Sequence, residues 1–490
     1  MTGDRATPAT RTHSSRATLL VVCASVFFSV LNGTMTNVAL PVIGEDLSVE
    51  PARLGWIITG YLLVYGVSVP FYGRLADLYG GRRLFVIGLL IFAGASLACA
   101  VAVSYPMLLA SRLVQALGAS AIPGLGMALI SQQFPAGQRG SAMGYVSATV
   151  GTGAAVGPTL GGILAGAFNW HFLFLFSALA GLLIPFALRS LPEGDRRPSE
   201  GLDLVGGVLV SLMVGGALLA ATEGARGDLL APQVVWAVIV SIISALALSF
   251  RQRLTRFPFI PRDLVHNRRY LALIAASFCT MAVSAGTFLS LPLLLVQTNR
   301  LPPVQVGLAL LPNALALAML GPFAGRLADR IGGRTPVRYG LVVMILSQLL
   351  FSSVGAGASP LIVSLLALLH GVGFAFINSP LSTMVSLVIP HDRLSSGLSI
   401  NSMCFFLGAG FGTALVAAVL TARGDAQSAL NPLYSLGAVG FSDAFLLSTP
   451  LLVIGLLLTA VLPRAGSRSV PELEGSTPTG QPAAGRALRR

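Results

Sequence analysis

The sequence has no lysine and few acids: 18 of its 490 residues are Asp or Glu, and charged residues make up only 10% of the chain. A soluble domain carries about a quarter of its residues as charged side chains. With 54% hydrophobic residues, this chain has more apolar surface than one soluble core needs. The composition therefore excludes a large soluble domain and predicts a protein of the lipid bilayer. Arginine as the sole basic residue, with abundant Ala, Gly and Leu, indicates a high-GC bacterium.

Cysteine is also scarce. Cys23, Cys99, Cys279 and Cys404 lie in separate apolar stretches and show neither metal-ligand spacing nor a disulfide framework. Phosphate-cradling loops, clusters of metal ligands and nucleophile constellations are missing from the sequence as well. We therefore expect no enzyme activity, no metal site and no cofactor.

Long apolar stretches are what the chain has instead. A helix needs about 20 mainly apolar residues to cross the hydrocarbon of a bilayer. Fourteen segments meet this requirement, which predicts an all-α, multi-pass membrane protein. The predicted spans are 17–43, 54–76, 84–104, 107–130, 141–166, 171–189, 204–222, 232–250, 270–296, 304–324, 337–357, 360–389, 395–421 and 441–462.

The arginines alternate across these spans. If the N-terminus is cytoplasmic, only Arg53, Arg226, Arg300 and Arg423 fall on the outer side, Arg112 lies in a span, and all others fall on the inner side. This distribution follows the positive-inside rule. It predicts a location in the cell membrane with both termini in the cytoplasm. The net charge of +13 is then a topology signal rather than a nucleic-acid-binding patch.

One loop occurs twice, after the second and the tenth span. The two copies are Gly73-Arg-Leu-Ala-Asp77-Leu-Tyr-Gly-Gly-Arg-Arg83 and Gly325-Arg-Leu-Ala-Asp329-Arg-Ile-Gly-Gly-Arg334. Matching loops on the same predicted side indicate a duplicated helical bundle. We interpret both as gating loops, in which Asp77 pairs with a nearby arginine or caps a helix N-terminus and so holds the two halves together. An ordinary positive-inside loop is the alternative.

The duplication divides the chain into parts. We predict a cytoplasmic N-terminal tail (1–16), a six-helix bundle (17–190), linkers with two extra spans (191–269), a second six-helix bundle (270–462) and a disordered cytoplasmic tail (463–490). The last segment is polar and contains Pro and Gly, a composition that cannot bury enough apolar surface to fold.

Glycines recur every fourth residue in the fifth span. Gly153, Gly157 and Gly161 share one helix face, and Pro158 and Gly162 adjoin them. A face of small residues lets another helix approach closely, and proline bends the helix. A generic packing face is the alternative to a functional motif.

Few ionisable groups remain inside the spans, and these are functional candidates because charge is costly in lipid. Arg112 and Gln115 lie three apart in the fourth span and face one way. We expect a wet cavity around them, and an arginine that reaches the outer interface is the alternative. We find no acid in the interior of any span, and place Asp443 at the outer start of the last one.

Polar residues on two further spans are candidates for transport and for contact with substrate. Asn32 and Thr36 share a face of the first span. His370 lies about 15 Å along the twelfth span, near mid-bilayer, and Phe374 and Asn378 share its face. Histidine titrates nearest to physiological pH, so His370 is a candidate proton carrier or substrate contact. A histidine hydrogen-bonded within the bundle, with no role in transport, is the alternative.

Together these motifs resemble the major facilitator superfamily, and specifically its fourteen-span drug:proton antiporter branch. The loop at 73–83 is similar to the superfamily motif between spans two and three. The segment 112–119 is similar to the fourth-span motif, whose arginine is linked to proton transfer, and 153–162 to the fifth-span motif taken to mark exporters. The first span and the segment 395–399 are similar to Gram-positive tetracycline and multidrug efflux proteins. The resemblance implies two bundles that rock around a central cavity lined by spans one, four, nine and twelve.

The chain departs from this branch in its acids. The branch usually has an acid in the first span, where this chain has Asn32 and Gly33. Tetracycline pumps have a glutamate in the thirteenth span, which here reads Phe405-Phe-Leu-Gly-Ala-Gly. The usual proton site and the usual attraction for cationic drugs are therefore missing. We expect a small amphiphilic substrate that is neutral, zwitterionic or anionic.

These observations predict a secondary active exporter of an antibiotic, drug or secondary metabolite, which would confer antibiotic resistance. It would work as a monomer by proton antiport with alternating access, and its partners would be lipid, substrate and protons rather than nucleic acid. A facilitator or importer of a small metabolite is the alternative within transport. A membrane sensor or scaffold would not need a duplicated gating loop.

Overall fold

The computed structural model describes residues 8–193, 201, 203–224, 230–424 and 426–461. Every regular element within these residues is helical. The elements are α1 (Pro8–Asp46), α2 (Pro51–Tyr79), α3 (Gly81–Ala100), α4 (Tyr105–Ala119), α5 (Ile122–Gln133), α6 (Ala136–Ala167), α7 (His171–Ala178), η1 (Leu179–Leu183), α8 (Ile184–Ser190), α9 (Leu204–Gly224), α10 (Pro232–Leu254), α11 (Arg262–His266), α12 (Arg268–Gln297), α13 (Pro303–Ile331), α14 (Arg334–Leu350), η2 (Phe351–Gly355), α15 (Pro360–Val388), η3 (His391–Arg393), α16 (Leu394–Arg423), α17 (Val439–Leu458) and η4 (Thr459–Val461).

Among the described residues, 14 helical segments are long and apolar enough to cross a membrane, which confirms the predicted number. Four of these spans combine more than one element. The fourth consists of α4 and α5, and the sixth of α7, η1 and α8. The eleventh consists of α14 and η2, and the thirteenth of η3 and α16. Pro123 and Pro185 lie in the first turn of α5 and α8, where a missing N–H costs no helical hydrogen bond. The proposed tail 463–490 lies outside the described residues.

Acids do lie within the spans, which corrects the sequence-based expectation. Asp77 and Asp329 lie in the last turns of α2 and α13, because these helices continue beyond their apolar stretches. Asp443 lies in the first turns of α17 and is 0% exposed. Its two carboxylate oxygens accept hydrogen bonds from Arg423 Nε at 2.8 Å and from the Leu430 N–H at 2.7 Å. A buried carboxylate is tolerated here because an arginine and a backbone amide satisfy it.

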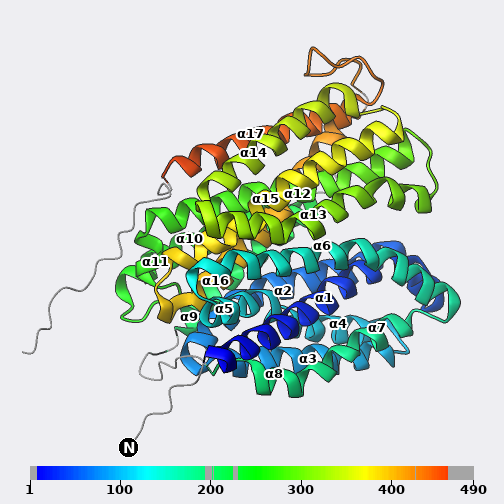
Figure 1. Cartoon of the computed structure of the whole chain (residues 1–490). Coiled ribbons are helices and arrows are strands. Elements are labelled where there is room, and N and C mark those ends of the chain that lie inside the picture. Colours follow the sequence, from blue (N-terminus) through cyan, green and yellow to red (C-terminus); the bar gives the residue numbers. More distant parts are fainter. Residues whose placement is uncertain (1–7, 194–200, 202, 225–229, 425, 462–490) are drawn as a thin grey trace, which may run out of the picture.

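The helices form two bundles that lie against each other (Figure 1). One contains α1–α8 and the other α12–α17, and we call them the N-terminal and C-terminal halves. The halves pack extensively through α6 with α13 and α15, and through α2 and α5 with α16. The start of α1 and the end of α17 lie at the same end of the molecule, which we call the terminal side. The other end is the opposite side.

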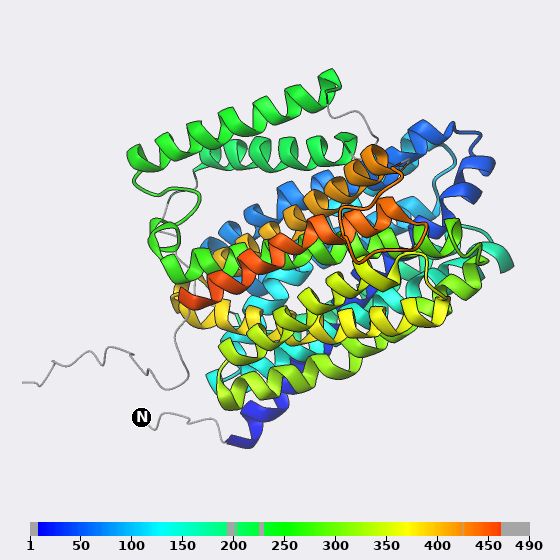
Figure 2. The ribbon, with the colours of Figure 1, turned by 90° about the horizontal axis from the view of Figure 1, so that it is seen from above.

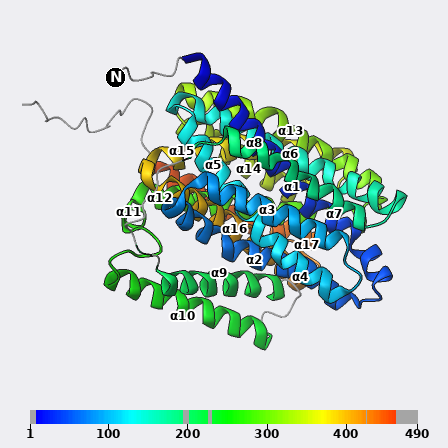
Figure 3. The same cartoon turned by 90° about the horizontal axis from the view of Figure 1, so that it is seen from below.

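The two inserted helices lie apart on one flank of the molecule (Figures 2 and 3). α9 packs against α2 and α16, one helix from each half, whereas α10 packs mainly on α9. Leu218 of α9 touches both halves at once: its Cδ1 methyl lies over Gly66 of α2 and its Cδ2 methyl over Gly410 of α16. At the base of the pair, Arg251 Nη2 lies 2.7 Å from Asp203 Oδ1. The insert is therefore a bridge across the seam between the halves.

The duplicated loops have the same backbone conformation. Gly80 ends α2 with a φ of 98°, and Gly332 ends α13 with a φ of 84°. Residues other than glycine rarely adopt positive φ angles of this size. α3 begins directly after Gly80, and α14 begins two residues after Gly332. The structure thus shows why this motif needs glycine at the turn in both copies.

Candidate functional site

Arg112 lies on α4 and is buried, with 2% of its surface exposed. Its Nη1 donates to Asn32 Oδ1 at 2.7 Å and to Gln115 Oε1 at 2.5 Å. Gln115 follows one turn later on the same helix, so the two side chains share a face as predicted. Arg112 does not reach the outer interface, and that alternative is wrong.

A chain of polar side chains extends from Arg112 through the N-terminal half. Gln115 Nε2 donates to Ser96 Oγ of α3 at 2.7 Å, and Asn32 Nδ2 donates to Ser177 Oγ of α7 at 2.9 Å. Each serine hydroxyl in turn donates to a carbonyl oxygen of its own helix. The network joins α1, α3, α4 and α7. Such connected buried networks fix the relative position of the helices that contribute to them.

The positive charge of Arg112 has neutral neighbours. Its hydrogen-bond partners among the described residues are two amide oxygens and no carboxylate. The guanidinium carbon lies 4.1 Å from the centre of the Tyr61 ring and 5.8 Å from that of Phe174. A desolvated cation over an aromatic face gains about 2 kcal/mol. Amide oxygens and ring faces therefore stabilise this charge instead of the acid that the antiporter branch usually has.

His370 lies in α15 and is 0% exposed. Neither ring nitrogen has a hydrogen-bond partner among the described residues. Its nearest aromatic neighbour is Phe288 of α12, whose ring centre lies 6.1 Å away in an edge-on arrangement. A buried polar group without a partner costs about 1–3 kcal/mol. The alternative of a histidine hydrogen-bonded within the bundle does not describe this side chain.

The predicted cavity residues are enclosed by protein. Thr36 is 1% exposed and donates to the Asn32 carbonyl oxygen, and Phe374 is 4% exposed. Asn378 is half-buried and donates from Nδ2 to Ser147 Oγ of α6 at 3.2 Å, across the interface between the halves. The expected solvent-filled pocket around Arg112 and His370 is therefore wrong for this conformation, because both side chains are packed against protein.

Asp77 joins the two halves on the terminal side. Its Oδ2 accepts from the Ser396 N–H at 3.1 Å, in the first turn of α16. The first amides of a helix lack partners within the helix and carry partial positive charge. Of the two roles considered for Asp77, helix capping is thus observed. Gly73 permits this contact, because a Cβ there would lie 2.9 Å from the Ser395 carbonyl oxygen.

Asp329 makes the corresponding contact in the other direction. Its Oδ1 and Oδ2 accept from the Gly140 and Ser141 N–H groups near the start of α6, each at 2.8 Å. Gly325 lies against the Gly140 carbonyl, where a Cβ would clash. Each half therefore uses its loop carboxylate to hold a helix of the other half. The sequence predicted such a lock at Asp77, and the structure shows two of them.

The arginines of the loops differ in their contacts. Arg326 Nη2 of the second loop donates to Tyr145 Oη of α6 at 2.8 Å, across the interface between the halves. Arg83 is exposed, whereas its neighbour Arg82 forms an ion pair with Glu193 at 2.7 Å. Arg334 donates to the Ala460 carbonyl oxygen at 3.3 Å, near the end of α17 in its own half. In the second loop an arginine thus adds to the contacts that glycine and aspartate make between the halves.

The glycine face of α6 packs against α1. A Cβ on Gly157 would clash with Thr34 Oγ1, and one on Gly161 would lie 2.9 Å from the Met35 Cα. A Cβ on Gly153 would lie 3.2 Å from Val30 Cγ1. Gly162, by contrast, would meet nothing within 4 Å. The predicted close approach of a second helix is confirmed, and Pro158 lies in the same helix between two contact positions.

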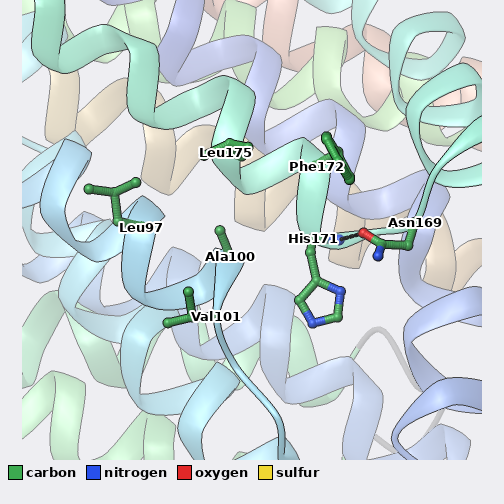
Figure 4. A pocket seen from close by; sticks show the side chains of 7 residues that line it. All are labelled: Leu97, Ala100, Val101, Asn169, His171, Phe172 and Leu175. Atoms are coloured by element: carbon green, nitrogen blue, oxygen red, sulfur yellow. Dashed lines mark hydrogen bonds between the residues drawn. The ribbon is translucent and has the colours of Figure 1, made fainter.

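Two hollows open on the opposite side, away from the interface between the halves. The first, of about 410 Å³, is bounded by α3 and α7 and is mostly apolar (Figure 4). In it the Asn169 Oδ1 accepts from the His171 N–H at 3.0 Å. The second, of about 550 Å³, lies beside the loop that holds Asp46 and Arg53. Both are confined to the N-terminal half, so neither connects the two polar sites.

Sequence reasoning missed several members of these sites. Ser96 and Ser177 complete the Arg112 network, Tyr61 covers the guanidinium, and Gln348 of α14 is buried near Thr287. The internal repeat offers a signal for Ser96 and Gln348. Gln348 follows Gly332 at the same spacing as Ser96 follows Gly80, so the two occupy corresponding positions of the two halves. Serine and tyrosine are too frequent in membrane helices to be selected without the fold.

Two related bundles, buried polar networks on facing helices and reciprocal locks at one end define a multi-pass membrane transporter. The family model of the Major Facilitator Superfamily matches residues 22–413 and 273–490, and the chain belongs to this superfamily.

The relatives agree with this assignment. The chain is 28% identical over 463 residues to the riboflavin transporter RibZ of Clostridioides difficile, covering 92% of this chain and 98% of the relative. It is 31% identical over 415 residues to the multidrug resistance protein Stp of Mycobacterium tuberculosis (strain CDC 1551 / Oshkosh), covering 83% of this chain and 76% of the relative. The crystal structure of the human organic anion transporter MFSD10 (TETRAN) is similar in fold, with a TM-score of 0.66 at 18% identity, over 91% of this chain and 99% of that chain.

Proposed function

We propose that this protein is a monomeric secondary active exporter that moves a drug, antibiotic or secondary metabolite out across a bacterial cytoplasmic membrane. The observation that carries the proposal is the reciprocal pair of locks at Asp77 and Asp329. Both locks join the halves on the same side of the molecule. The arginine distribution makes this the cytoplasmic side, so the structure corresponds to a state closed toward the cytoplasm.

Alternating access follows from breaking these locks. When substrate or a proton favours the state open to the cytoplasm, the carboxylates must leave the helix amides, and the halves must rock about the contact of α6 with α13. Because both carboxylates hold helix amides of the other half, both locks must open together. The glycines at the contact allow the helices to slide without side-chain clashes.

Export rather than import is supported by two further observations. The glycine face at Gly153, Gly157 and Gly161 has the spacing of the exporter motif, and it holds α1 against α6. The relative Stp is named a multidrug resistance protein. Both lead us to propose efflux of an amphiphile as the physiological direction, with resistance to toxic substrates as its result.

Proton antiport is the proposed energy source, with His370 as the proton carrier. His370 is buried, has unpartnered ring nitrogens and lies on a helix predicted to line the central route. Imidazole can accept and release a proton near neutral pH. The charge of Arg112, without a carboxylate, leads us to propose a neutral, zwitterionic or anionic substrate.

A facilitator or importer of a small metabolite is the second candidate. The observation that favours it is the relative RibZ, named a riboflavin transporter, which is similar over 92% of this chain. Under this alternative, riboflavin or a molecule of similar size would move inward, and no proton gradient would be needed.

Transport in vesicles of known orientation distinguishes these candidates. Purified protein is reconstituted into liposomes, and a panel of acidic, neutral and cationic compounds is tested with a pH gradient of either sign. Proton-coupled efflux predicts accumulation of an acidic or neutral amphiphile on the acidic side. Equilibration of the substrate without accumulation, at the same rate whatever the sign of the gradient, would favour the facilitator. Strong transport of monovalent cationic dyes, without transport of acidic compounds, would contradict the proposed substrate charge.

A further inference from the structure

The C-terminal half contains a second group of buried polar side chains. Thr280, Ser284 and Thr287 lie on one face of α12, spaced four and three residues apart. Gln348 of α14 reaches this face and donates from Nε2 to Thr287 Oγ1 at 2.7 Å. All four side chains are at most 2% exposed. A hydroxyl- and amide-rich site is thus enclosed by α12, α14 and α15, which pack together in Figure 1.

Several polar atoms of this group lack partners. Thr280 Oγ1, Ser284 Oγ, Gln348 Oε1 and both ring nitrogens of His370 form no hydrogen bond with any described residue. Buried polar atoms without partners are rare in folded proteins, and each needs an explanation. Their number on three neighbouring helices indicates that a ligand satisfies them during transport.

Phe288 separates this group from the exterior. It follows Thr287 directly, and its ring centre lies 6.1 Å from that of His370 and 6.5 Å from that of Phe374, edge-on to both. Phe288 is 42% exposed, although Thr287, which precedes it on α12, is buried. Rotation of this one ring would open a path to the polar group and offer an aromatic face to a flat ligand.

The composition of the group defines its ligand. It contains no arginine and no carboxylate, so it suits an uncharged molecule. Gln348 offers an acceptor oxygen, and a neutral imidazole offers one donor and one acceptor. If the Gln348 amide is turned by 180°, the atom without a partner is an N–H donor instead of an acceptor oxygen. With the imidazole, the site then still offers at least one donor and one acceptor to a ligand. A flat ring with an N–H beside a C=O meets these requirements.

We propose that Ser284, Gln348, His370 and Phe288 form a binding site for an uncharged lactam or imide ring of the transported substrate. The inference rests on the proposed transport function and extends it to a substrate class. The two halves then recognise different ends of one molecule. Arg112 in the N-terminal half would attract an anionic or electron-rich end, and the neutral group in the C-terminal half would hold the lactam.

Equilibrium binding to the purified full-length protein tests this site. The probes are 2-quinolone, a flat lactam, and N-methyl-2-quinolone, in which a methyl group replaces the hydrogen of the N–H donor. We expect 2-quinolone to bind at least tenfold more tightly than its methylated analogue. In the variants Gln348→Met and Ser284→Ala, we expect this preference to fall to less than threefold. The variant Ser290→Ala is the matched control, because Ser290 is buried on α12 but bonds only to the Gly286 carbonyl of its own helix.

Two outcomes would overturn the site. Equal binding of the two probes to the unaltered protein would show that no N–H is recognised. An unchanged preference in both Gln348→Met and Ser284→Ala would show that recognition occurs elsewhere. The measurement needs no gradient and no vesicle, so its failure is distinct from a failure of export. A lactam preference in a protein that does not pump protons would keep this site and reject the proposed coupling.

Discussion

Arg112 Nη1 and Asn32 Oδ1 lie 2.7 Å apart, so an amide receives the arginine in the span where related antiporters usually have a carboxylate. The guanidinium is buried, and Tyr61 covers it at 4.1 Å. The charge of this site is therefore one unit more positive than with an acid at position 32. The proposed substrate selectivity depends on that difference.

Asn32→Asp should reverse this selectivity. The new carboxylate would pair with Arg112, and a hydrogen bond to a charged group contributes about 1.5–3 kcal/mol. We expect transport of monovalent cationic dyes to rise at least tenfold and transport of acidic amphiphiles to fall. Uptake into proteoliposomes measures both. Asn401→Asp, which places an acid beside Ser277 in the other half, is the control and should leave the ratio unchanged. An unchanged ratio in Asn32→Asp would contradict the role of Arg112 in selectivity.

Asp77→Asn and Asp329→Asn should each weaken closure on the terminal side. Loss of a charged helix cap costs about 1 kcal/mol, which is about a fivefold change in the population of the closed state. Hydrogen exchange of segments 391–402 and 136–147 reports this change, and the double variant should exchange faster than either single one. Asp46→Asn, at the end of α1 on the opposite side, is the control. If neither segment exchanges faster, the carboxylates do not hold the closed state.

Gly157→Ala should destabilise the packing of α1 on α6, because the new methyl group would clash with Thr34 Oγ1. Overpacking of this kind costs about 1–3 kcal/mol. We expect a lower melting temperature of the purified protein and a reduced transport rate. Gly162→Ala adds the same methyl group on the open face of the same helix and should have little effect. Equal effects of both variants would show that helix propensity, rather than the contact with α1, dominates.

His370→Gln should abolish the coupling of transport to protons without abolishing the movement of substrate. A glutamine keeps the size and hydrogen-bonding capacity of the side chain but cannot carry a proton. We expect uphill, pH-driven efflux to be lost while downhill exchange of substrate continues. His391→Gln, in the loop before α16, is the matched control. Full pH-driven transport in His370→Gln would exclude this residue as the proton carrier.

Low pH should weaken the ion pair between Arg251 and Asp203 at the base of the insert. Burial raises the pKa of Asp203, but hydrogen bonds from Arg251 and the Gly206 N–H, with the charge of Arg251, lower the pKa below its usual value. A carboxyl with a depressed folded-state pKa stabilises the protein above its unfolded-state pKa, and this stabilisation is lost as pH falls through the folded-state value. The melting temperature should therefore fall below about pH 4, and less steeply in Asp203→Asn. If the melting temperatures of the unaltered protein and of Asp203→Asn depend on pH in the same way, Asp203 does not stabilise the insert through its charge.

The sequence predicted the number of spans, the duplication and the close approach at Gly157 because each depends on local spacing along one helix. It could not predict which helix Asp77 would cap, because Ser396 is distant in the chain and only the packing of the halves brings them together. Burial of Arg112 was missed for a similar reason: Asn32 and Tyr61 cover it from two other helices. The position of Asp443 near the start of the last span was predicted, but its pairing was not, because Arg423 reaches it from the end of α16.

The contact of Leu218 with Gly66 and Gly410 has a consequence for the entry of hydrophobic substrates. Amphiphiles partition into the lipid leaflets and can enter a transporter sideways, between two helices that border its central route. On the flank where α9 bridges α2 and α16, such lateral entry is sealed by the insert. Molecules dissolved in the lipid therefore cannot enter between α2 and α16, where the insert covers the seam between the halves.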